Sequence, residues 1–315
     1  MADSPQGRRL VADLALLLVC LVWGSTFVVV KDAVSRIPAL TFLCLRFLLA
    51  TGVLALVFCR PLGAHWRRLA RPGLVTGLCL GFAYLAQTVG LQYTQASRAG
   101  FITGLSVVIV PVLSPRLLGE RPPRRALVGV ALALAGLALL SFAPATPPTV
   151  GASPADAATL LGDALVLACA VGFAVHITLL GKYSAREVRS AGEAGVLATL
   201  QVGVAGLGYT LATLVELVRR GPSGVLPGLE APVVGAVVLT AVLATAGAFL
   251  VQTAAQRHTT PTHTALIFAS EPVFAALFGW MLLGERLGGW ALAGCGLILA
   301  GMVAAELPAG RETAP

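Results

Sequence analysis

Two charged residues, Arg46 and Glu271, lie inside long apolar stretches, where an ionised side chain is costly. Insertion scales put the cost at about 2.5–3.5 kcal/mol at the centre of a bilayer unless the charge faces a cavity or a partner. Glu271 could take up and release a proton or bind an amine; alternatively, it stays protonated or hydrogen-bonds a helix end freed by Pro272. Arg46 could bind a carboxylate, but a structural role is favoured, either paired with an acid or reaching toward carbonyls and headgroups. Pairing of Arg46 with Glu271 is one such hypothesis.

Six uncharged polar or aromatic residues also lie in apolar stretches and are candidates for lining a cavity: Trp23, Tyr84, Gln87, Thr103, His176 and Gln252. Trp23 could instead contact lipid, and Tyr84 and Gln87 could instead form hydrogen bonds between helices. For Thr103 a packing role is favoured. For His176 a neutral, hydrogen-bonded state is favoured over proton sensing.

The stretch that holds Tyr84 and Gln87 also carries Gly73, Gly77 and Gly81 at four-residue intervals. Small residues at this spacing let a second helix approach closely. Tyr84 and Gln87 are three residues apart and so share one side of a helix. We therefore expect packing and polar lining on different sides of this helix.

The sequence carries no recognisable metal or cofactor pattern. His258 and His263 are five residues apart without a set of Cys or carboxylates around them, and the six cysteines lack metal or redox spacing. A Walker motif and a Gly-x-Ser-x-Gly elbow are also missing. We expect no cofactor, no metal and no enzymatic activity. The alternatives are a polytopic membrane enzyme acting on a lipid-like substrate and, with less support, a channel.

The composition places these residues in a membrane protein. Hydrophobic residues make up 57% of the 315 residues, charged residues only 11%, and the mean hydropathy is +0.88. Soluble domains average about 25% charged residues, so an ordinary soluble protein is excluded. A helix needs roughly 20 apolar residues to cross a bilayer, and continuous apolar runs favour helices over a barrel. We predict an all-α protein with ten spans: 11–31, 39–59, 73–93, 96–116, 125–143, 159–181, 193–218, 231–255, 262–283 and 287–306.

Lys and Arg predict the orientation of these spans. We interpret the first apolar run as a span and not a cleaved signal peptide, because it is too long and lacks a clear cleavage site. With both termini cytoplasmic, fifteen of the 22 basic residues are inside and six outside; the inside set is Arg8, Arg9, Arg60, Arg67, Arg68, Arg71, Arg116, Arg121, Arg124, Arg125, Lys182, Arg186, Arg189, Arg257 and Arg311. The net charge of +8 then fits contact with anionic membrane lipid and requires no nucleic acid partner.

An internal repeat divides the chain. An offset of 165 residues lays residues 117–136 over 282–301 with twelve identities in twenty positions, and Leu-Leu-Gly-Glu-Arg occurs in both segments. We predict a cytoplasmic tail 1–10, a first repeat 11–143, a linker 144–158, a second repeat 159–306 and a cytoplasmic tail 307–315. Five spans per repeat make the second copy cross the membrane in the opposite sense. Inverted repeats are a recurrent architecture of transporters that work by alternating access. Glu120 and Glu285, each followed by Arg, are interpreted as structural or gating ion pairs.

Several short motifs, in order, resemble the EamA-type repeats of the drug/metabolite transporter superfamily. The first repeat offers Trp23-Gly24-Ser25, Lys31, Leu45-Arg46-Phe47, Gly90-Leu91-Gln92-Tyr93-Thr94 and Gly119-Glu120. The second offers Gly162-Asp163, Glu271-Pro272-Val273 and Gly284-Glu285. The resemblance spans about residues 10–306. It departs at Val107 or nearby apolar residues, where the second half has Glu271.

This resemblance implies a ten-helix carrier in the inner cell membrane for small metabolites, often amino acids or related compounds. It implies a central site lined from spans one, three, four, six, eight and nine. We expect a small amphiphilic substrate, export as the direction, and Glu271 as the candidate for proton coupling. The assembly is a monomer or a homodimer. The sequence leaves the substrate and the coupling ion open.

Overall fold

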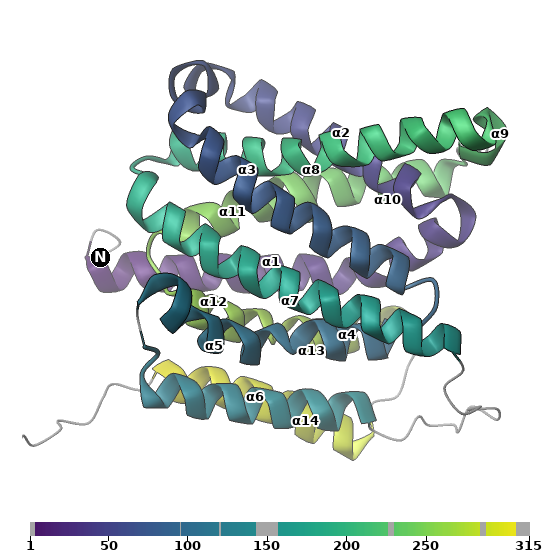
Figure 1. The fold of residues 1–315 in the computed structure, drawn as a ribbon. Coiled ribbons are helices and arrows are strands. Elements are labelled where there is room, and N and C mark those ends of the chain that lie inside the picture. Colours follow the sequence, from purple (N-terminus) through teal and green to yellow (C-terminus); the bar gives the residue numbers. More distant parts are fainter. Residues whose placement is uncertain are drawn as a thin grey trace, which may run out of the picture.

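The computed structural model describes residues 4–94, 96–119, 121–142, 157–225, 230–283 and 288–306, and within these ranges every regular element is a helix (Figure 1). The prediction of an all-helical protein is confirmed for this part of the chain. The helices run as follows: α1 (Pro5–Arg36), α2 (Ala39–Val57), α3 (Cys59–Gly90), α4 (Ala96–Gly104), α5 (Ser106–Leu118), α6 (Arg124–Phe142), α7 (Ala157–Glu187), α8 (Ala191–Arg220), α9 (Pro222–Val225), α10 (Ala231–Ala241), the π-helix η1 (Val242–Gly247), α11 (Ala248–Ala255), α12 (Pro261–Phe268), α13 (Glu271–Leu283) and α14 (Gly289–Glu306).

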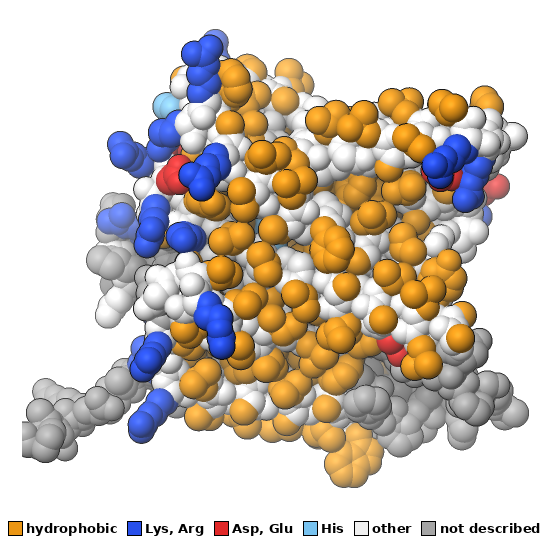
Figure 2. Space-filling model, viewed as in Figure 1, with side chains coloured by type: hydrophobic (Ala, Val, Ile, Leu, Met, Phe, Trp, Pro, Cys, Tyr) orange, Lys and Arg blue, Asp and Glu red, His pale blue; other side chains and the backbone are white. Residues whose placement is uncertain are grey.

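Seven stretches of the described residues are long and apolar enough to cross a membrane: Gln6–Thr26, Ala39–Val57, Cys59–Gly90, Ala99–Leu118, Ala157–Glu187, Ala191–Arg220 and Ala231–Ala255. The other three predicted ranges contain α6, the α12–α13 pair and α14. Apolar side chains cover the flank of the helical bundle (Figure 2). The structure is that of a membrane protein, and the count of ten spans stays a prediction. Several predicted features lie outside the described residues. They are linker residues 144–156, the tail residues 1–3 and 307–315, and Glu120 and Glu285.

Three of the predicted ranges are interrupted near their middle. Leu105 separates α4 from α5, the π-turn η1 separates α10 from α11, and Ala269 and Ser270 separate α12 from α13. The last break has a local cause, because Pro272 has no N–H for a helical bond to the preceding turn and is well suited to the first turn of a new helix. Apolar periodicity alone did not predict these breaks.

Glycines set the closest helix contacts. Gly73, Gly77 and Gly81 of α3 face α8, and a Cβ on Gly77 would lie 2.7 Å from the carbonyl oxygen of Gln201. The predicted close approach on this side of α3 is confirmed. Helices α6 and α14 lie side by side (Figure 1). At their contact, a Cβ on Gly129 would come 2.6 Å from the carbonyl oxygen of Gly301.

The two ends of the bundle differ in charge. We call the end with the start of α1 the basic end; it also holds the α2–α3, α5–α6 and α7–α8 connections and the α11–α12 loop. Most blue Lys and Arg side chains in Figure 2 gather there. Arg68 of α3 contacts Glu193 of α8 at 2.6 Å and joins two of these connections. We call the opposite end the far end. There, Arg36 of α1 contacts Glu230 at 3.1 Å.

Candidate functional site

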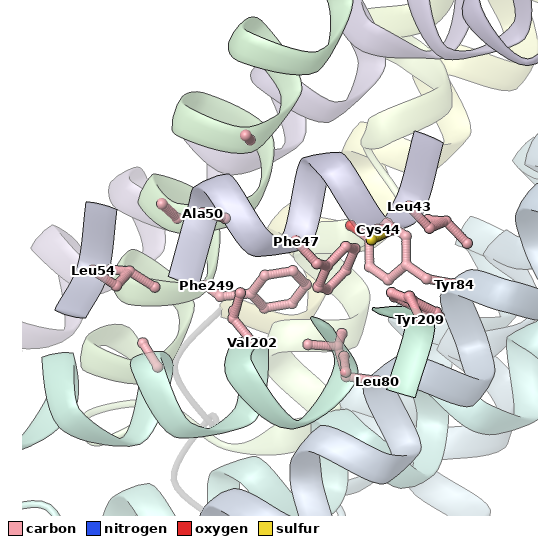
Figure 3. Close-up of a cluster of buried hydrophobic side chains, with 14 residues drawn as sticks. Leu43, Cys44, Phe47, Ala50, Leu54, Leu80, Tyr84, Val202, Tyr209 and Phe249 are labelled. Atoms are coloured by element: carbon pink, nitrogen blue, oxygen red, sulfur yellow. The ribbon is translucent and has the colours of Figure 1, made fainter. Parts of the chain in front are cut away.

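An aromatic cluster fills the middle of the bundle. Phe47 of α2, Tyr84 of α3, Tyr209 of α8 and Phe249 of α11 converge there (Figure 3). The ring centroids of Phe47 lie 5.2 Å from Tyr84 and 5.0 Å from Tyr209, in edge-to-face geometry. Such pairs are worth about 0.5–1.5 kcal/mol beyond their buried area. The cluster therefore ties together α2, α3, α8 and α11.

Trp23 joins α1 to the two interrupted helices of the second half. Its indole nitrogen donates to the carbonyl oxygen of Ala244 at 2.8 Å, and its ring lies 5.0 Å from Phe268 and 5.8 Å from Phe249. The side chain is half-buried. The π-turn η1 thus offers a carbonyl group that a side chain of α1 can reach, a use of π-turns often seen at functional sites.

Arg46 is buried, with 4% of its surface exposed, and its guanidinium group contacts η1 and Tyr84. Nε donates to Thr245 Oγ1 at 2.7 Å, and Nη2 lies 3.4 Å from both the Ala244 carbonyl oxygen and Tyr84 Oη. The guanidinium carbon is 4.9 Å from the centre of the Tyr84 ring. Arg46 and Glu271, both in the described part of the chain, form no ion pair with each other. The charge of Arg46 is instead stabilised by a hydroxyl group, a carbonyl group and an aromatic face.

Glu271 is the first residue of α13 and follows the break after α12. Its side chain is only partly buried, and its carboxylate lies within electrostatic range of Cys20 on α1, Tyr84 on α3 and Cys169 on α7. The positive end of the α13 dipole favours a carboxylate at this position. Three helices of the first and second halves therefore meet around an acidic group that has no hydrogen-bond or ion-pair partner among the described residues.

Gly24 fixes the position of Glu271 relative to α1. A Cβ on Gly24 would lie 2.9 Å from the Glu271 carbonyl oxygen and 2.9 Å from the Ala275 nitrogen. Both atoms are backbone atoms of α13, so neither can move without moving the helix. The absence of a side chain on Gly24 lets α1 and the first turn of α13 touch directly.

Gln87 and Thr103 connect α3 to α4 beside this group. Gln87 Nε2 donates to Thr103 Oγ1 at 3.2 Å, and both side chains are partly exposed. Thr103 also hydrogen-bonds Cys169 of α7. Partly exposed amide and hydroxyl groups near a carboxylate can bind a polar ligand, because their hydrogen bonds to each other can be exchanged.

His176 and Gln252 belong to two separate sets of buried hydrogen bonds. The side-chain amide of Gln201 donates to Thr253 Oγ1 at 3.0 Å. The side-chain oxygen of Gln201 accepts from His176 Nε2 at 2.8 Å. Gln252 Nε2 lies 3.4 Å from Gln256 Oε1. These contacts join α7, α8 and α11, and the structure does not bring His176 or Gln252 into hydrogen-bond contact with the groups around Glu271.

Comparison with known proteins identifies the family. The sequence model of the EamA-like transporter family matches residues 10–142 and 160–305. The chain belongs to the EamA-like transporter family. The resemblance found in the sequence motifs is thereby confirmed, and this EamA-like protein is a multi-pass membrane transporter.

Relatives of this EamA-like transporter carry general names. An "uncharacterized transporter" of Archaeoglobus fulgidus is 30% identical over 300 residues, which cover 95% of this chain and 87% of that protein. The "uncharacterized transporter YcxC" of Bacillus subtilis is 24% identical, with 96% and 95% covered. The "uncharacterized inner membrane transporter YedA" of Escherichia coli K12 is 32% identical over 133 residues, 40% of this chain and 42% of that protein.

A solved structure titled "Crystal structure of protein" shares the fold of this EamA-like transporter. The TM-score is 0.71 at 20% sequence identity, and the match covers 94% of this chain and 96% of the other. At that identity the likeness concerns the fold alone.

Several residues that contact Trp23, Arg46, Thr103 or Glu271 were not among the sequence candidates. Cys169, Thr245, Phe249 and Phe268 line or support the site but look like ordinary packing residues in the sequence. Gly24 gave a signal, because it follows Trp23 in a motif of the EamA-like family. The other four contribute through contacts between distant helices, which no local pattern reveals.

Proposed function

We propose that this EamA-like transporter is a secondary carrier that moves a small amphiphilic metabolite, an amino acid or related compound, by alternating access, with export as its direction. Glu271 carries the proposal. It is a partly exposed carboxylate at a helix break, without an ion-pair or hydrogen-bond partner among the described residues, and α1, α3 and α7 lie around it. A carboxylate in that position can bind a proton and release it when the surroundings change. Trp23, Tyr84, Gln87 and Thr103 are the proposed neighbours of the substrate.

Helix contacts support two inverted repeats of five spans, residues 11–143 and 159–306. In the proposed repeats α3 corresponds to α10 and α11, and α7 corresponds to α1. The contact between α3 and α7 therefore corresponds to the contact of α10 and α11 with α1. The α5–α7 contact likewise corresponds to the α13–α1 contact, and all of these contacts occur. The two separate matches of the family model support the same division.

Four glycines add independent support for this pseudo-symmetry. Gly129 and Gly294 are 165 residues apart, as are Gly136 and Gly301, so they hold corresponding places in the repeat. Gly129 packs against Gly301, and Gly136 packs against Gly294. Corresponding residues that face each other crosswise are expected where a two-fold axis passes between α6 and α14.

The basic end is proposed to be cytoplasmic, which places both termini inside. Positively charged residues are retained on the cytoplasmic side during insertion, and the basic end holds most of them (Figure 2). A single chain contains both halves of the proposed carrier, so a monomer suffices for transport, although a homodimer is compatible with the same mechanism.

Transport in liposomes tests the proposal. The purified protein is reconstituted with an imposed pH gradient and offered a panel of amino acids and small amines. We expect protein-dependent accumulation that Glu271→Gln abolishes, while exchange of labelled for unlabelled substrate without a gradient continues, because the variant binds substrate but cannot release a proton. Glu230→Gln, at the exposed far end, is the matched control.

Two results would contradict the proposal. Accumulation that remains fully driven by the gradient in Glu271→Gln removes this residue from coupling. A panel without any uptake above that of protein-free liposomes contradicts the proposed substrate class.

A further inference from the structure

A carboxylate and an imidazole meet at the basic end, away from the groups around Glu271. Asp13 Oδ1 lies 3.2 Å from His263 Nε2, with 16% and 9% of the two side chains exposed. Asp13 belongs to α1 and His263 to the first turn of α12, where Thr260 caps the helix by accepting from the His263 N–H at 3.2 Å. The contact therefore joins two helices that are distant in sequence and that both border the proposed site.

The contact lies in a closely packed part of the basic end. Near that end α12 packs against α1, α5 and α7, and a Cβ on Gly181 of α7 would lie only 2.7 Å from Pro261 Cγ. At the far end the counterpart of α12 is α4, which packs against α7 but touches α1 and α13 only slightly. Among the described residues, α12 thus packs more closely against α1, α5 and α7 at the basic end than α4 packs against α1 and α13 at the far end.

A corresponding contact at the far end has different chemistry. Asp163, near the start of α7, accepts from Thr94 Oγ1 at 2.7 Å, just before α4 begins. In each half an aspartate near the start of the first helix reaches the segment that opens an interrupted helix of the other half. Threonine does not titrate, whereas histidine changes charge between about pH 5 and 8. Of these two contacts, the one at the basic end is the one that includes a histidine.

Other charged groups surround His263 on the helices that pack against α12. Arg9 of α1 lies 3.9 Å from Asp13 Oδ2, Arg116 of α5 donates to Val112, and Lys182 of α7 donates to the Leu117 carbonyl oxygen at 3.0 Å. In the adjoining loop Arg257 donates to the Arg189 carbonyl oxygen, and His258 lies within electrostatic range of Arg8 and Arg257. Among the side chains that the structure describes, the remaining charges at this end of those helices are Arg124 and Arg125 of α6 and Arg186 and Glu187 of α7.

We propose that Asp13 and His263 form a proton-sensitive latch that holds the basic end of this transporter closed. The proposal rests on alternating access as proposed above. A protonated His263 attracts the Asp13 carboxylate more strongly than neutral imidazole does, and at low exposure that difference is only partly screened. Acid at the basic end therefore favours the closed state, and loss of the proton as the pH rises favours opening between α5 and α12. If that end is cytoplasmic, cytoplasmic pH sets how often the carrier opens inward.

Distance measurements between spin labels test the latch without knowledge of the substrate. Labels are attached to cysteines introduced at Arg116 and His258, both exposed, in full-length protein whose six native cysteines are replaced. Between pH 5.5 and pH 8.5 we expect the ratio of long to short distances to rise by roughly three- to tenfold. His263→Gln keeps a donor but cannot titrate, so the ratio should no longer depend on pH. His65→Gln is the matched control, because His65 lies 3.8 Å from Glu193 at the same end but on α3 and α8.

The exchange Asp13→His with His263→Asp guards against a simple folding defect. It should restore the pH dependence that each single change removes. A wild-type ratio that does not change with pH, or the same pH response in His263→Gln as in wild type, overturns the latch. The proposed carrier function would still stand after those outcomes if liposome uptake depends on Glu271. Failure of the latch and failure of the proposed function are therefore distinguishable.

Discussion

Arg46 and Glu271 have different surroundings in the structure. Arg46 is buried and its donors are engaged by Thr245, the Ala244 carbonyl oxygen and Tyr84. Glu271 is partly exposed and has no such contacts in the described part of the chain. A group whose hydrogen bonds are already formed contributes to packing, whereas one without partners is available to a proton or a ligand. We therefore propose a stabilising role for Arg46 and a transport role for Glu271.

Replacing Arg46 by Lys tests the structural assignment. An ammonium group cannot bond Thr245 and lie over the Tyr84 ring as the planar guanidinium does. We expect a loss of about 1.5–3 kcal/mol, seen as a fall of roughly 3–8 °C in the thermal midpoint in detergent. Arg60→Lys, exposed near the start of α3, should leave the midpoint unchanged. An unchanged midpoint in Arg46→Lys together with lost uptake of a carboxylate substrate would show Arg46 to be a substrate ligand instead.

Interrupted helices are the elements that create the site. The α12–α13 break places Glu271 at a helix start, and the π-turn η1 presents the Ala244 carbonyl oxygen to both Trp23 and Arg46. Broken helices are tolerated in a membrane where the freed backbone groups find partners inside the protein. The close packing of α1 against α13 at Gly24 then holds one of these breaks at a fixed depth.

A methyl group at Gly24 should displace α13. Gly24→Ala puts a Cβ about 2.9 Å from three atoms of α13, two of them backbone atoms, so we expect a destabilisation of roughly 1–3 kcal/mol and reduced transport. Gly52→Ala, where nothing lies within 4 Å of the added Cβ, should be neutral or slightly stabilising. Thermal midpoints and liposome uptake for both variants provide the comparison. Equal behaviour of the two alanine variants would contradict a role for Gly24 in holding α13.

In the proposed architecture, the whole molecule combines two similar halves with unequal charge at its ends. Contacts between counterpart helices recur in both halves, while most Lys and Arg side chains gather at the basic end (Figure 2). Helix packing and charge determine different properties of the molecule. Packing determines how the halves meet, and the charge bias determines which way the assembled bundle is inserted.

Reporter fusions test the topology at this scale. If the C-terminus is cytoplasmic as proposed, we expect a fluorescent protein fused after residue 315 to be bright in a bacterial host and alkaline phosphatase at the same place to be inactive. Fusions after residue 150, in the linker, should give the reverse pattern if the first repeat has five spans. Phosphatase activity at both places would contradict inversion of the second half, since five spans must lie between these two positions.

The membrane class, the helical class and the family were all predictable from the sequence, because they depend on the length of apolar runs and on motifs within them. The importance of Arg46 and Glu271 was likewise visible, since a charge in an apolar run is a local anomaly. Their partners were not. Thr245 lies 199 positions from Arg46, and His263 lies 250 residues after Asp13.

Only the tertiary structure decided which residues meet and where the interrupted helices break. Helices that are apolar on most sides give little indication of the face that turns inward, because a membrane helix does not need one polar face toward water. Helix rotation and contact are set by packing among distant segments, such as Gly24 on α13 or Gly129 against Gly301. The sequence therefore determined that the chain forms membrane helices carrying two unusual charges, and the packing decided that one charge is enclosed and the other left available.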